Sequence, residues 1–438
     1  MKKVIFSTVL VVVLFTGIVQ AQTIYDFGGE TVWIWHNQTY ERMYGDNPEG
    51  VAHLDWVEKT FNVDLEWSTP GAPQDARMVE PLAAAVMAGD APDLFRIQTR
   101  GMALAALQGL VRPINDVVDE EFKTRIPSWK INDFDSISKV GDSYYAFGAD
   151  PPQGTGIWWN KAIFEREGLV SPYELYINGE WTWDAMRDLA IKATRDTDGD
   201  GEIDQWGLAE YESWTIGLPV WLLASNEATT FRIDENGHAV FAMDEPEAMA
   251  VWEFLYDLAH VSKVMPVEGV DRRAVFQAGD AAMIAHRTWG ARHFSSMEED
   301  YSFVPFPKGP KADRHYAVFN HANVWGIPVT SKWPTEALVE LLYAIFKMPE
   351  EYMDADSETE KEDWATSFFI MNARDYESVE TFYWVIDNSE VFTAHDEVYI
   401  PGFADAMTRI VVYGENPATV IASMKQPVQA HLDELFNK

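Results

Sequence analysis

Acidic side chains recur at alternate positions in the segment DTDGDGEID, residues 196–204. Three carboxylates spaced two residues apart converge on one hard cation when a loop coils around it, and the glycine at position 201 permits the sharp turn. The residue after that glycine would offer its backbone carbonyl, as in an EF-hand loop. The spacing therefore predicts a structural calcium site, formed by Asp196, Asp198, Asp200, the carbonyl of Glu202, and Asp204.

The segment departs from the EF-hand pattern at its twelfth position, where Gly207 replaces the bidentate glutamate. Asp204 would then have to complete the coordination shell, directly or through water. The alternative is an Asp-Gly hairpin that binds no ion. Met186, Leu189 and Ala193 stand at helical spacing just before the loop, so a bound ion would fasten the loop beside a helix.

Signatures of enzymes are missing from the sequence. It holds no Gly-x-Ser-x-Gly, His-Glu-x-x-His, Gly-x-x-x-x-Gly-Lys or Gly-x-Gly-x-x-Gly segment, and its ten histidines show no metal-ligand spacing. Two carboxylates could hydrolyse a glycosidic bond, but 70 acidic residues make any single pair uninformative. We assign no catalytic residue and expect a protein that is not an enzyme.

The N-terminus has the pattern of a secretory signal peptide. Lys2 and Lys3 precede an apolar run from Val4 to Val19, and Ala21 ends a small-x-small cleavage site. The alternative is a single membrane-anchoring helix, but the run is short for a span of about 20 residues and no stop-transfer flank follows it. We expect residues 1–21 to be removed on export.

The chain contains no cysteine. A disulfide framework and a thiolate metal site are therefore excluded. A lipobox cysteine is missing as well, so we expect a mature protein without a lipid anchor. An exported protein of this kind would diffuse away from a cell that lacks an outer membrane, which favours a periplasmic location.

The formal net charge is −37, from 33 basic and 70 acidic residues. This charge repels phosphate backbones and anionic membranes, so a nucleic-acid partner is excluded. Hydrophobic residues make up 47% of the chain, which is enough for a packed core. A chain of 438 residues ordinarily forms two domains.

Segments with strand and helix periods alternate along the chain, and this alternation predicts an α/β fold. Val32 and Ile34 predict one face of a short strand, and Leu54, Val57 and Phe61 predict a helix after it. A second strand follows at residues 63–67, and a third begins near residue 93.

Five motifs, in this order, resemble the extracellular solute-binding proteins of ABC sugar transporters (family 1, similar to maltose-binding protein). The resemblance has two departures: Trp159 stands where tyrosine is usual, and the residues before Trp289 are His-Arg-Thr where glycine is common. The motifs are MAGDAPDLF (87–95), GIWWNKAIFEREGL (156–169), WTWDAMRDL (181–189), VFQAGDAAMIAHRTWG (275–290) and FVPFPKGP (303–310).

The resemblance implies a two-lobed α/β fold of the periplasmic-binding-protein type (type II-like), with a ligand cleft at the hinge. Each lobe would be discontinuous in sequence. After the signal peptide at 1–21, lobe 1 would comprise residues 22–148 and 315–368, and lobe 2 would comprise residues 149–314 and 369–438.

The resemblance also implies ligand-binding positions, because flat aromatic rings stack on the C–H faces of sugars while polar groups bind the hydroxyls. Trp289 matches a position whose tryptophan stacks on sugar in maltose-binding relatives. For any single tryptophan the alternative is packing in the core. The implied ligand-binding residues are Trp35, His36, Gln98, Thr99, Tyr211, Glu212, Trp214, Trp289, Asn320, His321 and Asn323.

The function implied is a periplasmic carbohydrate receptor, a monomer, that delivers a sugar or oligosaccharide to the transmembrane subunits of an ABC permease. Two alternatives remain: a secreted carbohydrate-active enzyme, and a binding protein for a peptide or another polar solute. The sequence does not name the sugar, its chain length or its linkage.

Overall fold

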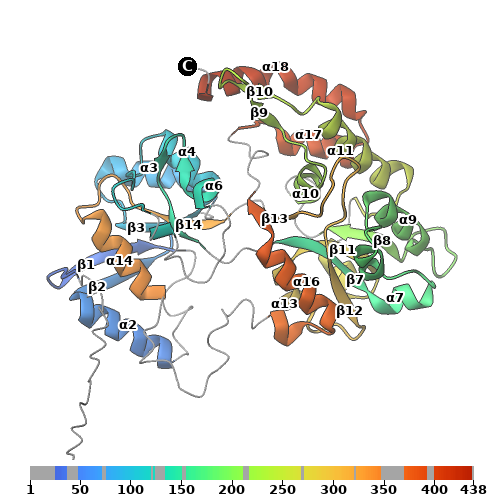
Figure 1. Ribbon diagram of the computed structural model, residues 1–438, viewed down its shortest axis with the longest axis horizontal. Coiled ribbons are helices and arrows are strands. Elements are labelled where there is room, and N and C mark those ends of the chain that lie inside the picture. The colour runs from blue at the N-terminus through green and yellow to red at the C-terminus, as the bar shows by residue number, and fades with distance from the viewer. Residues whose placement is uncertain are drawn as a thin grey trace, which may run out of the picture.

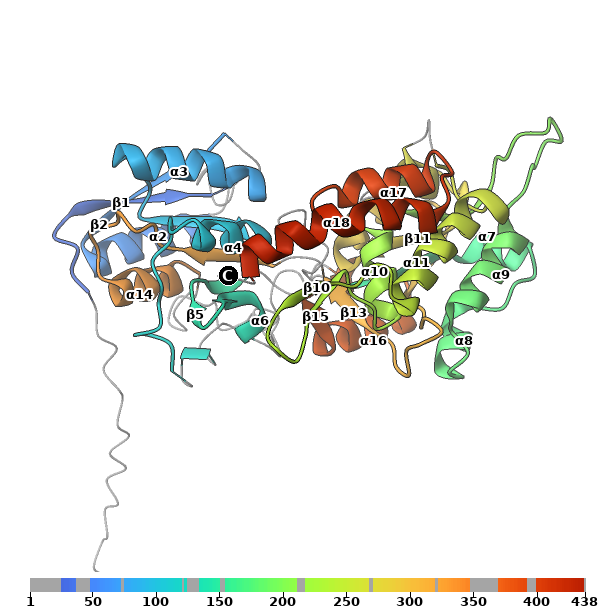
Figure 2. The same ribbon diagram turned by 90° about the horizontal axis from the view of Figure 1, so that it is seen from above.

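The computed structural model has two α/β lobes that lie side by side (Figures 1 and 2). Among the residues that the structure describes, no helix is both long and apolar enough to cross a membrane. The structure describes residues 25–36, 48–71, 75–119, 122–123, 134–149, 154–210, 217–267, 271–319, 322–346, 369–391 and 399–436.

The first lobe is built on a five-stranded sheet in the order β2-β1-β3-β14-β6. Strand β1 pairs in parallel with β2 and β3, whereas β14 is antiparallel to both β3 and β6. Strand β14 is therefore inserted beside β3 from a distant part of the sequence. The strands are β1 (Glu30–Trp35), β2 (Val63–Ser68), β3 (Leu94–Gln98), β6 (Phe147–Ala149) and β14 (Asn323–Gly326).

Helices cover both faces of this sheet. Val32 and Ile34 of β1 pack with α2 and α14, while Trp35 packs on the opposite face with α3 and α4. The expected alternation of β1 between two apolar faces is confirmed. The helices and the small hairpin of this lobe are α2 (Pro48–Phe61), η1 (Ala76–Met78), α3 (Val79–Ala88), α4 (Thr99–Leu107), α6 (Phe134–Ser138), β4 (Lys139–Val140), β5 (Ser143–Tyr144) and α14 (Thr335–Phe346).

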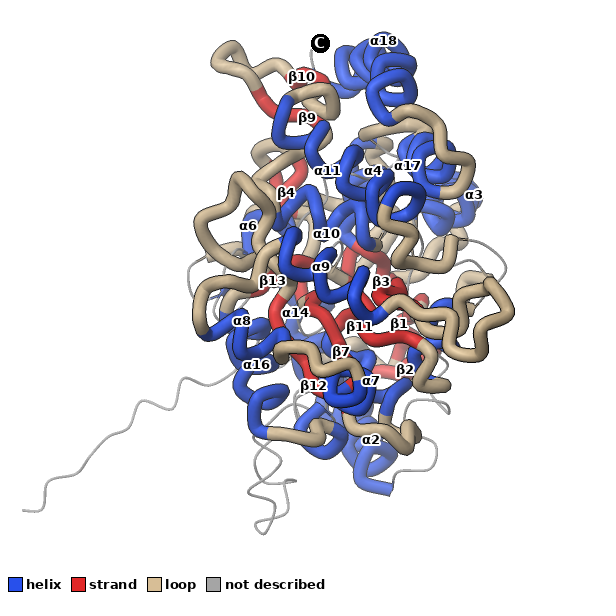
Figure 3. The backbone as a smooth tube through the Cα atoms, turned by 90° about the vertical axis from the view of Figure 1, so that its right-hand side faces the viewer, coloured by secondary structure: helices blue, strands red, loops and turns tan. Residues whose placement is uncertain are grey.

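The second lobe is built on a four-stranded sheet in the order β12-β7-β11-β8. Strand β7 is antiparallel to β11 and β12, and β11 is parallel to β8. Every residue of β7 is buried, because apolar clusters with helices pack on both faces of the sheet. Figure 3 shows β7, β11 and β12 as strands, with α7 beside them. The strands are β7 (Thr155–Asn160), β8 (Trp206–Glu210), β11 (Ala281–Arg287) and β12 (Tyr301–Pro305).

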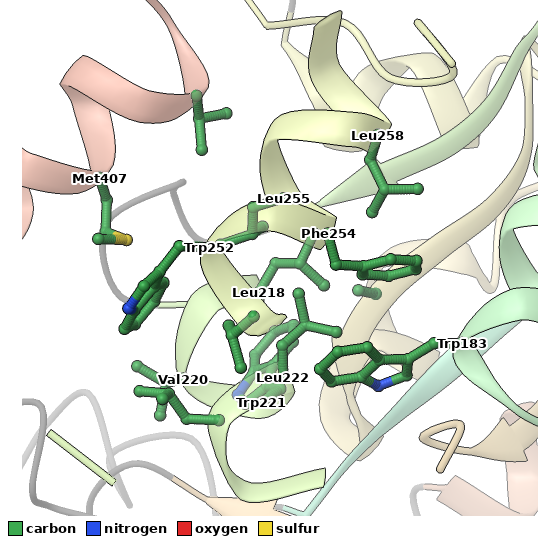
Figure 4. Packing of buried hydrophobic residues seen from close by; sticks show 14 of the residues in the cluster. Trp183, Leu218, Val220, Trp221, Leu222, Trp252, Phe254, Leu255, Leu258 and Met407 are labelled. Atoms are coloured by element: carbon green, nitrogen blue, oxygen red, sulfur yellow. The ribbon is translucent and has the colours of Figure 1, made fainter. Parts of the chain in front are cut away.

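The larger core of the second lobe lies between this sheet and α9, α10, α11 and α17, and Figure 4 shows part of it. Trp183 stacks on Phe254 with ring centroids 4.8 Å apart, and Trp252 is fully buried. On the other face, Trp158 packs among aromatic rings of α13, β12 and residue 369. Positions within strands or on helix faces predict four core tryptophans, Trp159, Trp183, Trp206 and Trp252. The first two and Trp252 are buried, whereas Trp206 is half-buried.

Further elements complete the second lobe. They are α7 (Lys161–Arg166), α8 (Pro172–Ile177), α9 (Trp183–Ala193), α10 (Leu218–Ser225), β9 (Phe231–Ile233), β10 (Ala239–Phe241), α11 (Pro246–Tyr256), the π-helical turn η2 (Asp257–Val261), α12 (Arg272–Gln277), η3 (Thr288–Gly290), α13 (Ala291–Phe294), β13 (Ala317–Phe319), α16 (Tyr376–Asp387), β15 (Ser389–Val391), α17 (Phe403–Val411) and α18 (Pro417–Phe436).

The chain passes between the lobes after β6, after β13 and after α14. Strand β13 pairs with β15, and its residues Ala317 and Val318 lie in the cores of the second lobe. We therefore propose that the boundary expected near residue 315 lies after residue 319. Strand β6 reaches Ala149 within the first sheet, so we place the first crossing after residue 149 and not after residue 148. The boundary between residues 368 and 369 stays a prediction.

Candidate functional site

The carboxyl end of β3 lies directly beside the start of β14. Gln98 is the register partner of Asn323, and both side chains are half-buried. The backbone N–H of Thr99 donates to the carbonyl of Ala322 at 2.8 Å, which extends the pairing by one step. Three of the expected ligand-binding residues, Gln98, Thr99 and Asn323, thus meet at one edge of the first sheet.

The side chain of Gln98 is held by a neighbour on α4. Arg100 Nε donates to Gln98 Oε1 at 2.7 Å, and the same guanidinium lies 3.7 Å from the carboxylate of Asp75. Arg100 therefore orients the amide of Gln98. Thr99 is 7% exposed, so its position at the start of α4 is mainly structural.

Trp35 and His36, at the end of β1, are more buried than a ligand-stacking role needs. Trp35 is 8% exposed and packs in the core, with its ring 5.8 Å from that of Trp33. His36 is 6% exposed and stacks on Trp325 at 5.6 Å. Both side chains therefore pack inside the first lobe and support the end of its sheet.

Trp289 lies at the matching edge of the second sheet. Strand β11 ends at Arg287, opposite Thr155 at the start of β7, and η3 then presents Trp289. The Trp289 ring is half-buried, in contrast with the fully buried Trp158. Its centroid lies 4.9 Å from that of His286 and 4.9 Å from that of His293.

The two histidines beside Trp289 are held in their neutral forms. Burial lowers the pKa of His286 well below its ordinary value, and nearby His293 and Arg287 lower it further. Burial also lowers the pKa of His293, and the charge of Arg273 adds to this effect. At neutral pH these rings are therefore uncharged hydrogen-bonding groups.

Helix α12 positions His293. Arg273 Nη1 lies 2.9 Å from His293 Nδ1, and Gln277 Nε2 donates to the His293 carbonyl at 2.6 Å. Arg273 and Gln277 share a helix face because they are four residues apart. Neither Arg273 nor His293 was among the expected site residues. The sequence offers one signal, the helical spacing that puts Arg273 and Gln277 on one face, and this spacing does not indicate that His293 lies beside them.

Chain connectivity keeps the two sheet edges close together. From the end of β6 at Ala149 to the start of β7 at Thr155, six residue steps span at most about 20 Å. From the end of β13 at Phe319 to Asn323, four steps span at most about 14 Å. The edges that carry Gln98, Asn323 and Trp289 therefore border the crossings between the lobes.

Five of the expected site residues lie outside the described residues. Tyr211, Glu212 and Trp214 come directly after Glu210, the last residue of β8, in the sequence. Asn320 and His321 come between β13 and β14. Their roles stay predictions.

The acidic loop between α9 and β8 lies on the side of the second lobe that faces away from the first (Figures 1 and 2). Carboxylate oxygens of Asp196, Asp198 and Asp204 lie within 4.8 Å of one another, and all three residues are exposed. Asp196 also accepts hydrogen bonds from the N–H groups of Gly199 and Gly201, at 2.6 and 2.9 Å. The loop thus coils so that three of the five expected ligand residues converge.

Asp200 and Asp204 have different roles in this loop. Asp200 Oδ1 accepts from the Glu202 N–H at 2.8 Å and is not part of the group of three. Thr197 donates its N–H and hydroxyl to Asp204, and these bonds lower the pKa of the Asp204 carboxyl. An ionised, oxygen-only donor set of this kind suits Ca²⁺.

Known proteins show what the chain is similar to. Residues 58–343 match the model of the family described as bacterial extracellular solute-binding protein. No curated protein sequence matches the chain. The similarities to solved structures concern the fold, because the sequence identities are low.

Three solved structures illustrate this similarity. The maltose/maltodextrin-binding domain MalE of Bdellovibrio bacteriovorus, bound to maltotriose, is 15% identical, with 92% of this chain and 99% of that chain covered and a TM-score of 0.63. An ABC substrate-binding protein from Listeria monocytogenes in complex with cycloalternan is 16% identical (92% and 98% covered, TM-score 0.62). UgpB from Mycobacterium tuberculosis in complex with glycerophosphocholine is 16% identical (92% and 98%, TM-score 0.64).

Proposed function

Because this chain belongs to the family of bacterial extracellular solute-binding proteins, whose model matches well over half of it, we propose that it is a carbohydrate receptor. It would bind a sugar or oligosaccharide and present it to the transmembrane subunits of an ABC permease. The observation that carries the proposal is the half-buried ring of Trp289 at one sheet edge, across the crossings from the amides of Gln98 and Asn323.

This arrangement matches the chemistry of a sugar. A sugar ring has weakly apolar C–H faces, on which an indole stacks, and a rim of hydroxyls, which amides bind as both donors and acceptors. The rings of His286 and His293 would add neutral hydrogen-bonding groups beside Trp289. Several structural relatives, among them the Bdellovibrio and Listeria proteins, bind oligosaccharides, which supports the same ligand class here.

Binding would couple to a movement of the lobes. A ligand that contacts Trp289 on one lobe and Gln98 on the other favours the conformation in which both contacts exist. The crossings after β6 and β13 are short segments at element ends, where hinge rotations are absorbed. The closed form would be the one that the permease recognises.

The family consists of binding proteins, so a catalytic role would be an addition to its known activity. No bond needs to break for transport, and the groups around Trp289 serve shape and hydrogen bonding. The secreted carbohydrate-active enzyme remains the alternative to test. The glycerophosphocholine complex of UgpB shows that this fold also holds solutes that are not sugars.

Residues 1–21 would direct export and be removed, and the mature protein would act as a monomer in the periplasm. The N-terminal residues that support this proposal lie outside the described residues. Detection of mature protein beginning near residue 22 in a periplasmic extract, at the mass of one chain, would test it.

We also propose that the loop at residues 196–204 binds Ca²⁺. Asp196, Asp198 and Asp204 would hold the ion with carboxylate oxygens, and Asp200 and the Glu202 carbonyl would join them after a small rearrangement. The ion would staple the loop beside α9, away from the sugar. Its role would be structural.

The experiment for the sugar receptor is a titration of the purified protein with a panel of monosaccharides and oligosaccharides, followed by intrinsic fluorescence and calorimetry. Trp289→Ala should weaken binding by about tenfold or more, because stacking and burial are lost together. Trp206→Ala is the matched control, since Trp206 is also half-buried but begins β8 at the opposite end of the same sheet. Failure of the folded protein to bind any saccharide, or steady hydrolysis of one, would overturn the proposal.

A further inference from the structure

Cationic side chains gather around Trp289, although the chain as a whole is strongly acidic. Arg273 contacts His293, whose ring lies 4.9 Å from that of Trp289. Arg287 ends β11, two residues before Trp289. In a chain with 70 acidic and 33 basic residues, arginines are scarce, so their concentration at this edge calls for a reason.

These arginines are drawn into the protein. Arg287 is 4% exposed, and the side chain of Arg272 is 21% exposed. Surface charges that only improve solubility remain in water, because desolvating a guanidinium costs free energy unless anionic or polar partners compensate. The partly desolvated guanidinium groups therefore fix positive charge at this edge, next to the Trp289 ring, which we propose stacks on the ligand.

A buried carboxylate at this edge compensates part of the charge. Glu210, at the end of β8, is fully buried, and its Oε2 lies 3.8 Å from Arg272 Nη1. A guanidinium has five N–H donors in a planar fork, so an arginine that already has a partner can still bind an anion. The inference does not require any of these arginines to be unpaired.

The other groups at this edge do not cancel the positive charge. Burial keeps His286 and His293 neutral, so they add donors and acceptors but no charge. On α13, Arg292 is exposed and adds a further cation. Asp271, which caps α12, is an exposed carboxylate beside Arg272. Across the described parts of β8, β11, α12 and α13 at this edge, Arg272, Arg273, Arg287 and Arg292 still outnumber the two carboxylates, Glu210 and Asp271.

We propose that the ligand is an acidic sugar, whose carboxylate or sulfate group is bound beside the Trp289 ring by Arg273, with Arg272 and Arg287 supporting it. The inference rests on the proposed function and narrows its substrate class. A uronate carboxylate has two anionic oxygens and a sulfate ester has three terminal oxygens, and a guanidinium can bind two oxygens of either group in a bidentate manner. The sugar ring would stack on Trp289. Its anionic substituent would reach Arg273, which contacts His293, the neighbour of Trp289.

The test compares ligands that differ in one group. Calorimetric titrations would use a uronic-acid oligosaccharide, the same oligosaccharide with its carboxyl groups reduced to alcohols, and a sulfated neutral oligosaccharide of equal length. We expect the wild-type protein to bind at least one anionic form about tenfold or more tightly than the neutral form, as for a hydrogen bond to a charged group. Which anionic form binds identifies the source of the charge.

Variants then test which arginine causes the preference for the anionic form. Arg273→Gln should remove the preference for the anionic form, measured as the ratio of the affinities of the same variant for the anionic and the neutral oligosaccharide. Arg166→Gln is the matched control: Arg166 is exposed on α7, donates to Gln205 at the opposite end of the second sheet, carries the same formal charge, and its replacement should keep the preference. Arg273→Lys keeps the positive charge but loses the planar set of N–H donors, so its preference for the anionic form should lie between those of the wild type and Arg273→Gln. Melting curves of all variants show whether each one folds.

The outcomes separate this inference from the proposed function. Equal or tighter binding of the neutral oligosaccharide overturns the acidic-sugar inference and supports the receptor. An Arg273→Gln variant that melts earlier but keeps the anionic preference shows that the arginines are structural, which also overturns the inference. Absence of binding to every saccharide by folded wild-type protein overturns the receptor proposal itself.

Discussion

Lys161 Nζ donates a hydrogen bond to Asp375 Oδ2 across 2.8 Å, and this contact joins the start of α7 to the start of α16. Lys161 belongs to the Trp-Asn-Lys motif, and the residue before it, Asn160, caps α7 by accepting from the N–H groups of Ala162 and Ile163. Asn160 also donates to Glu299 at 2.5 Å. The motif therefore holds the second lobe together and is structural.

Replacing Asp375 should destabilise the second lobe. The carboxylate accepts from Lys161 and also caps α16 through the N–H of Ser378 at 2.8 Å. Asp375→Ala loses the cap and the charged hydrogen bond, so the free energy of unfolding should fall by about 1–3 kcal/mol. Asp375→Asn retains a capping oxygen, so its free energy of unfolding should fall by a smaller amount. Chemical denaturation of both variants at neutral pH measures the difference, and equal stabilities of Asp375→Ala and the wild type would contradict it.

The same contact should depend on pH. Burial alone would raise the pKa of Asp375, but hydrogen bonds from Lys161 and Ser378 outweigh burial and lower it. Because the folded-state pKa lies below the unfolded value of about 3.9, the contribution is present above that pH and is lost as pH falls through the folded-state pKa. The stability difference between wild type and Asp375→Asn should therefore shrink below about pH 4. A difference that stays constant to pH 3 would exclude this linkage.

Gly207 should not tolerate a side chain. A Cβ atom there would lie 2.1 Å from the carbonyl oxygen of Ala190 in α9, so the backbone of the helix or of β8 would have to move. Gly207→Ala should lower the free energy of unfolding by about 3 kcal/mol or more, the upper end of the range for overpacked cores. Gly179→Ala is the control, because its Cβ would meet nothing within 4 Å and only its φ of 75° opposes substitution, at about 1 kcal/mol. Similar melting temperatures for the two variants would refute the explanation.

Removal of calcium should lower the melting temperature. An ion that binds only the folded loop stabilises the protein by mass action, by about 2.7 kcal/mol when its free concentration is one hundred times Kd. Asp198→Asn, which weakens one of the three converging carboxylates, should reduce the difference between calcium and chelator. Asp184→Asn, an exposed carboxylate on α9, is the control. Superimposable melting curves of the wild type in calcium and in chelator would favour the hairpin without an ion.

The paired amides at the edge of the first sheet should contribute to affinity. Gln98→Ala and Asn323→Ala should each weaken saccharide binding by about 1–3 kcal/mol, the range for a lost hydrogen-bonding partner at a binding site. Because the two residues are register partners, the double variant should lose less than the sum of the two losses. Thr31→Ala, an exposed polar site at the opposite end of β1, should bind as the wild type does. Calorimetry of the four variants measures these effects.

Much of the fold could be predicted from the sequence because it is set by local patterns. The period-two alternation of Val32 and Ile34 places them on one face of β1, and a helix-capping residue such as Asn160 acts on the next turn of its own chain. The order of the motifs predicted the family, and the family match confirmed it. The coil of the acidic loop follows likewise from residues at most eight positions apart.

The candidate site depends on contacts that no local pattern encodes. The pairing of Gln98 with Asn323 joins strands far apart in the chain, and the burial of Trp35 follows from the helices that pack on that face of the sheet. The position of Arg273 beside His293 likewise depends on how α12 lies against α13. The sequence by itself determined the elements, the family and the composition of the acidic loop. Only the tertiary structure decided which polar groups meet at the sheet edges, because those neighbours are chosen by strand register and helix packing over long sequence separations.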